Sequence, residues 1–356
     1  MNKHILLNLF LFSYLLISAQ QVYSINTIKV NFAADSADFV VAKDGSGNFT
    51  TVQAAINAIP DYRKKRTIVY IKNGIYNEKL ILPASKQTVT FIGENVEKTI
   101  IAYGDWAQKK TILGEEIGTS GSATFFVYGN DFYAQNITFQ NTAGPVGQAV
   151  AAHVSSDRCV FYNCRFRGYQ DTLYTYAENS RQYYKNCYIE GTTDFIFGWS
   201  TAVFDGCTIH CLKDSYITAA STSQSTKYGY LFYKCKITAD SSVHKMYLGR
   251  PWRVYAKTVF RECELGSFIR AEGWHNWNKP EAEKTTFYGE YKNTGPGADT
   301  VERVKWSHKL KEQEANEWTV EKVLAGDDGW KPILPPDPQK IKRSPPPPEG
   351  GERKAP

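Results

Sequence analysis

The stretch Phe161-Tyr162-Asn163-Cys164-Arg165-Phe166 recurs along the chain, and its recurrence decides the fold. Each copy has an aromatic residue, two mostly polar residues, a cysteine, a variable residue and an apolar residue. The later copies are Tyr184-Lys185-Asn186-Cys187-Tyr188-Ile189, Phe204-Asp205-Gly206-Cys207-Thr208-Ile209, Phe232-Tyr233-Lys234-Cys235-Lys236-Ile237 and Phe260-Arg261-Glu262-Cys263-Glu264-Leu265. A period of about 20 to 30 residues, as these cysteines show, is typical of a solenoid, in which each repeat packs on its neighbours.

The composition of the repeats indicates which solenoid this is. They are rich in Val, Ile, Phe, Tyr and Thr, are punctuated by Gly, Asn and Asp, and contain no helix-length amphipathic pattern. The Leu-x-x-Leu-x-Leu pattern of leucine-rich repeats is also absent. The sequence therefore predicts an all-β fold, a right-handed single-stranded parallel β-helix with short capping helices.

Stacked coils place the repeated cysteines above one another, about 4.8 Å apart. We expect them to form an inward-facing column, since cysteine packs well as a small apolar residue. Asn136, which lies one repeat before Cys164, would cap this column in place of a cysteine. The rung spacing also suits disulfides between neighbours, but the residues alone leave the pairing open.

The two ends of the chain differ from the repeats. A basic start, an apolar run over residues 5–17 and the small residues that follow predict a signal peptide over residues 1–24. A membrane anchor is the alternative, but the run is short for a span. Residues 25–334 would form one β-helix domain, and the Pro-rich residues 335–356 a disordered tail. Residues 51–59 have helical spacing and would cap the coil, and an amphipathic segment over residues 309–324 could cap the other end or pack outside.

The net charge of +6 suits a protein that meets a polyanion. There is no recognisable nucleic-acid motif, and an exported protein seldom meets nucleic acid, so we expect no nucleic-acid partner. The sequence has no Cys-x-x-Cys pair and no His-Glu-x-x-His motif, so we expect neither a metal nor a cofactor.

The rung spacing also groups polar residues. Gln148, Asp171 and Asp194 follow one another at equal intervals of one rung, and Arg250 lies close to two rungs beyond Asp194. An amide, two carboxylates and a guanidinium would thus share one face, with Gln170 beside Asp171. Such residues can also be ladder residues that satisfy backbone groups in the turns, but their combination favours function.

This column has the groups for acyl transfer. Two carboxylates one rung apart push their pKa values apart, and the one beside Arg250 stays ionised while the other holds a proton. That arrangement provides a nucleophile and a general acid, and the two glutamines can donate hydrogen bonds to an oxyanion. Aromatic walls for sugar rings or a methyl group would come from Tyr174, Phe195, Phe197 and Trp252.

Five motifs in order resemble the pectin methylesterase (pectinesterase) family, over residues 40–330. They are Gly74-Ile75-Tyr76-Asn77-Glu78, Gly147-Gln148-Ala149-Val150, Tyr169-Gln170-Asp171-Thr172-Leu173-Tyr174, Gly191-Thr192-Thr193-Asp194-Phe195-Ile196-Phe197-Gly198 and Leu248-Gly249-Arg250-Pro251-Trp252. The resemblance implies a carboxylic ester hydrolase that removes methyl groups from the galacturonate esters of pectin (homogalacturonan), releasing methanol and pectate. It also implies secretion, to the cell exterior or the periplasm, and we expect a monomer that has no membrane contact after signal cleavage.

The resemblance also implies residue roles. Asp194 matches the nucleophile, Asp171 the general acid and base, Gln170 the main oxyanion donor and Gln148 a supporting one. Arg250 matches the residue that orients the nucleophile and contacts substrate.

Further matches concern the cleft and the cysteines. Trp252 matches a wall of the substrate cleft, and Thr119 matches a substrate-binding threonine. Cys187 and Cys207 match a disulfide of bacterial relatives. The stretch Asp214-Ser215-Tyr216-Ile217-Thr218-Ala219-Ala220-Ser221 looks more like bacterial members than plant ones, and the segment from Tyr176 to Ser180 looks longer than the family pattern.

Other functions fit the sequence less well. A pectin-binding β-helix without activity has no need of paired carboxylates. A pectate lyase needs a cluster of acidic calcium ligands with a basic catalyst, and a polygalacturonase needs three close aspartates. Neither arrangement is found, and no Gly-x-Ser-x-Gly motif supports a serine esterase.

Overall fold

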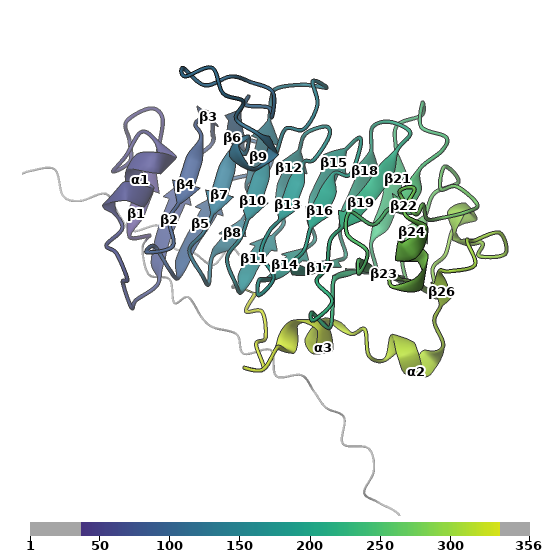
Figure 1. The fold of residues 1–356 in the computed structure, drawn as a ribbon. Helices are drawn as coiled ribbons and strands as arrows, with labels where there is room; N and C mark the ends of the chain where they lie inside the picture. Colours follow the sequence, from purple (N-terminus) through teal and green to yellow (C-terminus); the bar gives the residue numbers. More distant parts are fainter. Residues whose placement is uncertain (1–36, 335–356) are drawn as a thin grey trace, which may run out of the picture.

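The computed structural model describes residues 37–334, in which the chain winds into a right-handed parallel β-helix (Figure 1). This confirms the predicted fold. The expected signal peptide and Pro-rich tail lie outside the described residues. Each complete rung contributes one strand to each of three sheets, which we call sheets A, B and C, and neighbouring strands in them are parallel.

Over the described residues, sheet A has 11 strands, sheet B 8 and sheet C 7. Sheet A contains β1 (Phe39–Val41), β2 (Thr67–Ile71), β5 (Val89–Gly93), β8 (Tyr133–Gln135), β11 (Cys159–Tyr162), β14 (Arg181–Lys185), β17 (Thr201–Asp205), β20 (Tyr230–Tyr233), β23 (Lys257–Arg261), β25 (Phe287–Tyr291) and β26 (His308–Lys309). Sheet B contains β3 (Gly74–Asn77), β6 (Thr99–Tyr103), β9 (Thr138–Asn141), β12 (Arg165–Arg167), β15 (Tyr188–Gly191), β18 (Thr208–Cys211), β21 (Lys236–Ala239) and β24 (Glu264–Leu265). Sheet C contains β4 (Leu80–Leu82), β7 (Phe125–Val127), β10 (Ala152–Val154), β13 (Leu173–Thr175), β16 (Ile196–Gly198), β19 (Tyr216–Ala220) and β22 (Tyr247–Gly249).

The aromatic position of the repeat forms a ladder inside the coil. Phe161 stacks on Tyr184 with ring centroids 5.1 Å apart, Tyr184 on Phe204 at 4.9 Å, and Phe204 on Phe232 at 4.5 Å. Phe232 and Phe260 continue the ladder at 4.3 Å. All these rings are buried, so the ladder joins successive rungs through apolar contact as well as through strand hydrogen bonds.

The residue before each repeated cysteine turns the chain from sheet A to sheet B. It has a positive φ in every copy, as at Asn163 (49°), Asn186 (53°) and Gly206 (62°). Asn and Gly accept this left-handed conformation readily, which explains their presence in the repeat.

Asn136 occupies this turn position and does not cap the cysteine column, so that expectation was wrong by one residue. Its φ is 57°, and its side-chain oxygen accepts a hydrogen bond from Asn163 Nδ2 at 2.7 Å. Because Thr138 pairs with Arg165, the residue that aligns with Cys164 is Ile137, which is fully buried.

The repeated cysteines are all buried, as the column predicted. Every cysteine of the chain is a free thiol, Cys187 and Cys207 included. The backbone N–H of Cys187 points to Cys207 Sγ at 3.4 Å, so the two residues are neighbours on adjacent rungs without a bond between their sulfurs. The disulfide expected from bacterial relatives is therefore absent from this structure.

Helix α1 (Val52–Ala58) closes the N-terminal end of the coil, as expected (Figure 1). The Thr51 hydroxyl caps it, and the Glu78 carboxylate accepts hydrogen bonds from the N–H groups of Val52 and Gln53 at 2.9 Å. Val52 and Ile56 are buried against the coil, which keeps the apolar interior from water.

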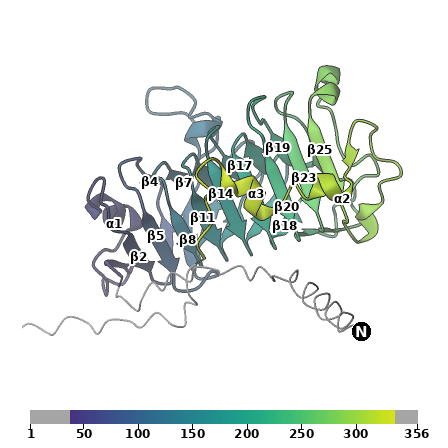
Figure 2. The same cartoon turned by 90° about the horizontal axis from the view of Figure 1, so that it is seen from below.

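The C-terminal segment packs on the outer face of sheet A rather than capping the coil. Helix α2 (Glu312–Ala315) and helix α3 (Val320–Ala325) cross this face, and α3 lies against β14, β17 and β20 (Figure 2). The Arg181 guanidinium binds the carboxylates of both Asp157 and Asp328 and so ties the end of α3 to the sheet. The remaining helical turns are η1 (Thr119–Gly121), η2 (Pro280–Lys284) and η3 (Pro296–Ala298).

Over residues 37–334, no helix has both the length and the apolar character needed to cross a membrane.

Candidate active site

A cavity of about 570 Å³ lies on the outer face of sheet C, and it collects nearly all the predicted site residues. The predicted residues that line it are Thr119, Gln148, Gln170, Asp171, Tyr174, Asp194, Phe197, Arg250 and Trp252. They come from several separate stretches of chain, so the β-helix itself, rather than any one loop, builds the site.

Asp171 and Asp194 sit where successive rungs enter sheet C, just before β13 and β16. Their φ angles are 65° and 50°, a conformation that costs free energy for residues other than glycine and that occurs often at functional sites. The backbone holds it through two hydrogen bonds, from Asp171 N–H to Thr193 O at 3.1 Å and from Asp194 N–H to Tyr216 O at 2.8 Å. Because Leu173 pairs with Ile196, the two aspartates are in register one rung apart.

Arg250 binds the Asp194 carboxylate through two hydrogen bonds. Its Nε donates to Oδ1 at 3.0 Å and its Nη2 to Oδ2 at 2.7 Å, and the Asp194 side chain is only 8% exposed. A paired, bidentate contact fixes the plane of the carboxylate as well as its charge.

The two carboxyl groups differ in their electrostatic surroundings. Burial raises the pKa of Asp171 well above its ordinary value, the charge of Asp194 raises it further, and Arg250 opposes this. Burial also raises the pKa of Asp194, but the hydrogen bond and the charge of Arg250 pull it back. Asp171 therefore keeps its proton to higher pH, and Asp194 is the partner that ionises.

The two glutamines lie side by side at the same rim of the cavity. Gln148 forms a β-bridge with Gln170, so it aligns with Gln170 and not with Asp171 as the equal spacing in the sequence predicted. The Oε1 atom of Gln148 accepts a hydrogen bond from Gln108 Nε2 at 3.1 Å. This leaves the amide nitrogen of Gln148 as the group that can donate to a substrate oxygen.

Aromatic rings form the floor of the cavity beside the two aspartates. Tyr174 and Phe197 stack with centroids 4.1 Å apart, and the Trp252 ring lies 6.0 Å from Phe197. Phe195 does not take part, which corrects the sequence prediction. It is fully buried in the interior of the coil, because the left-handed turn at Asp194 interrupts the alternation of side chains and turns Phe195 inward.

Three further aromatic residues line the cavity and were not predicted as site residues from the sequence: Tyr176, Trp199 and Trp277. Tyr176 and Trp199 follow β13 and β16, where the rungs leave sheet C, and their rings lie 4.2 Å apart. The Arg253 guanidinium lies over the Trp199 ring at 4.9 Å and also lines the cavity. These residues stand outside the repeat, and only their aromatic character could have singled them out.

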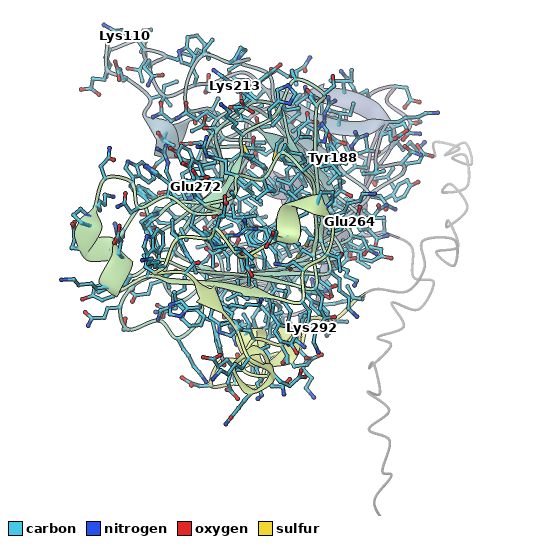
Figure 3. The ribbon with its side chains drawn as sticks, turned by 90° about the vertical axis from the view of Figure 1, so that its right-hand side faces the viewer. Lys110, Tyr188, Lys213, Glu264, Glu272 and Lys292 are labelled. Atoms are coloured by element: carbon cyan, nitrogen blue, oxygen red, sulfur yellow. The ribbon has the colours of Figure 1, made fainter. Side chains whose placement is uncertain are left out.

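A long excursion between β6 and β7 extends outward from the coil (Figure 1). It contains Thr119, which lines the cavity. Lys110 lies at its outer part, away from the coil (Figure 3). At its base, buried Asp105 binds Lys79 Nζ and Lys109 Nζ at 2.6 Å each, and Lys79 also donates to Gly121 O at 2.7 Å. This triad anchors the turn that presents Thr119.

His153 supports the same turn from sheet C. Its ring packs between Tyr174 and Tyr176, each with a centroid distance of 4.8 Å, and its Nδ1 faces Ser120 O at 3.4 Å. Burial lowers the pKa of His153 to about 4, so the imidazole is neutral near pH 7. It contributes packing to the cavity floor and no charge.

The arrangement combines an ionisable carboxylate, a protonated carboxyl group and two amide donors around one cavity. That set can attack an ester carbonyl, stabilise the oxyanion and protonate the leaving alcohol. Within residues 37–334, no three His, Cys, Asp or Glu side chains gather as metal ligands.

Comparison with known proteins gives one consistent result. The family model described as Pectinesterase matches residues 38–327. Pectinesterase 31 of Arabidopsis thaliana is 43% identical over 283 residues, which cover 77% of this chain and 88% of that protein. Two further relatives, from Arabidopsis thaliana and Prunus persica, have names that combine pectinesterase with pectinesterase inhibitor. Each is 44% identical, and the matches cover 82% and 76% of this chain and 53% of each relative.

The similar solved structures are also pectin methylesterases. Pectin methylesterase from carrot is 37% identical with a TM-score of 0.77, and the match covers 82% of this chain and 94% of that one. A pectin methylesterase in complex with a hexasaccharide is 30% identical with a TM-score of 0.74, covering 85% and 100%. The curated relatives named above are plant proteins, so the expected likeness to bacterial members is not supported.

Proposed function

The chain belongs to the pectinesterase family and hydrolyses methyl esters of pectin, and from this premise we propose that Asp194 is its nucleophile. The reaction converts a methyl galacturonate residue and water into galacturonate, methanol and a proton. The observation that carries the assignment is the pairing of Asp194 with Arg250, one rung from a carboxyl group that keeps its proton.

In the first step the Asp194 carboxylate attacks the C6 carbonyl carbon of the substrate. A new C–O bond forms and the carbonyl electrons move onto oxygen, where Gln170 and Gln148 donate hydrogen bonds. The bond to the methoxy oxygen then breaks, and Asp171 transfers its proton to that oxygen, so that methanol leaves. The result is an anhydride between Asp194 and the galacturonate.

In the second step a water molecule attacks the galacturonate carbonyl of this anhydride. Asp171, now a carboxylate, removes the proton from the water, and the bond to Asp194 breaks. Asp194 returns as a carboxylate beside Arg250, and Asp171 regains its proton for the next cycle.

The cleft supports a polysaccharide substrate. Trp252, Phe197 and Tyr174 provide faces against which sugar rings or the methyl group pack, and Thr119 adds a hydroxyl to the lining. The unpaired Arg253 gives the cleft a positive charge that suits an acidic polymer; no ion pair involves it among the described residues.

We also propose the domain organisation, the oligomeric state and the location of the protein. Its catalytic domain comprises residues 25–334, and it acts as a monomer outside the cell without cofactor or metal. The apolar run over residues 5–17 supports export, and the location of pectin in cell walls is consistent with it.

The test is methanol release from highly methylated pectin, measured with and without EDTA. Wild type and an Asp327→Ala variant, which changes an exposed aspartate, should release methanol at equal rates. Asp194→Ala should fold, as judged by its melting temperature, and release none. Near wild-type release by Asp194→Ala would overturn the nucleophile assignment, and loss of activity in EDTA would overturn metal independence.

A further inference from the structure

Arg250 is held from both sides as well as by Asp194. Its guanidinium lies 3.9 Å from the ring centroid of Tyr216 and 3.7 Å from that of Trp277. Guanidinium groups stack on aromatic faces through charge and dispersion, and both distances are within the range of strong contacts. The guanidinium is thus sandwiched between two rings. The rings fix the guanidinium plane in which it binds the Asp194 carboxylate.

The two rings differ in what else they do. Trp277 lines the cavity, whereas Tyr216 is not among the lining residues. Tyr216 is on β19, one rung beyond the nucleophile, and its backbone oxygen accepts the hydrogen bond from Asp194 N–H at 2.8 Å. The same residue therefore supports the left-handed backbone of Asp194 and the side chain of its partner.

The Tyr216 ring is itself held in place. It stacks on Tyr247, its strand neighbour on β22, with centroids 5.2 Å apart and planes inclined by 9°. His275 packs against both rings at 5.6 and 5.4 Å, and its Nδ1 accepts a hydrogen bond from Trp277 N–H at 3.1 Å. One histidine thereby connects the two sides of the sandwich.

Resting on the function proposed above, we propose that Tyr216 is a positioning residue for the reaction, acting through Arg250. Its ring keeps the guanidinium in the plane that holds Asp194 ionised and aimed at the ester carbonyl. Without the ring, Arg250 gains freedom on the face that Tyr216 covers, and the bidentate contact loosens. The buried Asp194 carboxylate is then left with a weaker counter-charge.

The test compares Tyr216→Leu, which removes the ring, with Tyr216→Phe, which keeps it. A Tyr216→Thr variant provides a second ring-free side chain, one that suits a strand, in case Leu disturbs folding. Tyr247→Leu is the matched control, because it removes the next ring of the stack, which has no contact with Arg250 among those described. For each folded variant, kcat and KM for methanol release are measured from acid to neutral pH.

We expect Tyr216→Leu and Tyr216→Thr to lower kcat about tenfold with little change in KM. The acid limb of the kcat/KM profile should move to higher pH in both, because a loosened Arg250 no longer lowers the Asp194 pKa as strongly. The titratable groups that interact with Asp194 are Asp171, Arg250 and the buried Tyr288. Burial lowers the pKa of His275, so its imidazole adds no charge at the upper end of this range. Tyr216→Phe should stay within about twofold of wild type, and Tyr247→Leu should leave the acid limb in place.

Three results would overturn the role of Tyr216. They are an unchanged acid limb in the ring-free variants, an equal loss in Tyr216→Phe, or an equal shift in Tyr247→Leu. Failure of the proposed function looks different, since wild type would then release no methanol or Asp194→Ala would remain active.

Discussion

Arg250 and Asp194 meet through two hydrogen bonds, Nε to Oδ1 at 3.0 Å and Nη2 to Oδ2 at 2.7 Å, although they lie about two rungs apart in the chain. Lysine keeps the charge but cannot make both contacts. Arg250→Lys should therefore lower kcat/KM by about 10- to 100-fold, and Arg250→Ala should lower it further. Initial rates of methanol release measure this, with Arg165→Lys on the outer face of sheet B as the control. Equal activity of Arg250→Lys and wild type would show that charge alone suffices.

Asp171 links catalysis to stability. Its folded pKa is raised, so the native state retains a proton that the unfolded chain releases above a pH of about 4. The unfolded state then binds fewer protons, and the stability of the wild type falls as pH rises from the unfolded pKa toward the folded one. Asp171→Asn should lose activity but melt at a higher temperature than wild type at pH 7, with a smaller difference at pH 3.

Thermal denaturation at the two pH values measures this difference, and Asp327→Asn controls for loss of an exposed charge. A lower melting temperature of Asp171→Asn at pH 7 would mean that the Asp171 carboxyl group stabilises the fold, contrary to this account.

The free thiols of Cys187 and Cys207 predict indifference to reduction. Incubation with dithiothreitol should leave the melting temperature and the activity unchanged, because no cross-link is lost. A native disulfide typically contributes about 2–4 kcal/mol, so its reduction would lower the melting temperature by several degrees. Thiol titration of the denatured protein, which should count seven cysteines, is the independent check.

Trp199 extends the aromatic surface of the cleft beyond the residues that touch the aspartates. Trp199→Ala should raise KM for polymeric pectin about 3- to 10-fold and leave kcat nearly unchanged, since we expect this cavity-lining ring to pack against sugar rather than against the reacting ester. Trp199→Phe should recover most of the binding. A fall in kcat at constant KM would instead place Trp199 in the chemical step.

The β-helix could be predicted from the sequence because each position of the repeat has the same structural role in every rung. The aromatic residue stacks in the ladder, the residue before the cysteine turns the chain with a positive φ, and the cysteine packs inside, so one repeat corresponds to one rung. The register of Asp171 with Asp194 followed from the same period, since both precede a strand by the same distance.

The errors arose where the backbone departs from regular strand. The predicted position of Asn136 and the predicted alignment of Gln148 were each wrong by one residue, because the number of residues in the turns differs from rung to rung. Phe195 was assigned to the cleft although the left-handed turn at Asp194 sends it inward. Trp199 and Trp277 lie on connecting segments, where no period exists to place them.

Each rung enters sheet C at the catalytic rim, with Gln148, Asp171 and Asp194, and leaves it at the opposite rim, where Tyr176, Trp199 and Trp252 follow their strands. Insertions at the exit change the wall of the cleft without altering the strand pairing that sets the aspartates in register. The segment from Tyr176 to Ser180 follows one such exit, and its Glu178 carboxylate accepts a hydrogen bond from the Ser225 hydroxyl, which lies beyond β19, at 2.8 Å. Arg250 also follows its strand at the exit rim, so the pairing of β22 with β19 has to be kept for catalysis, whereas the connecting segments that carry the aromatic wall can differ in length without moving the aspartates.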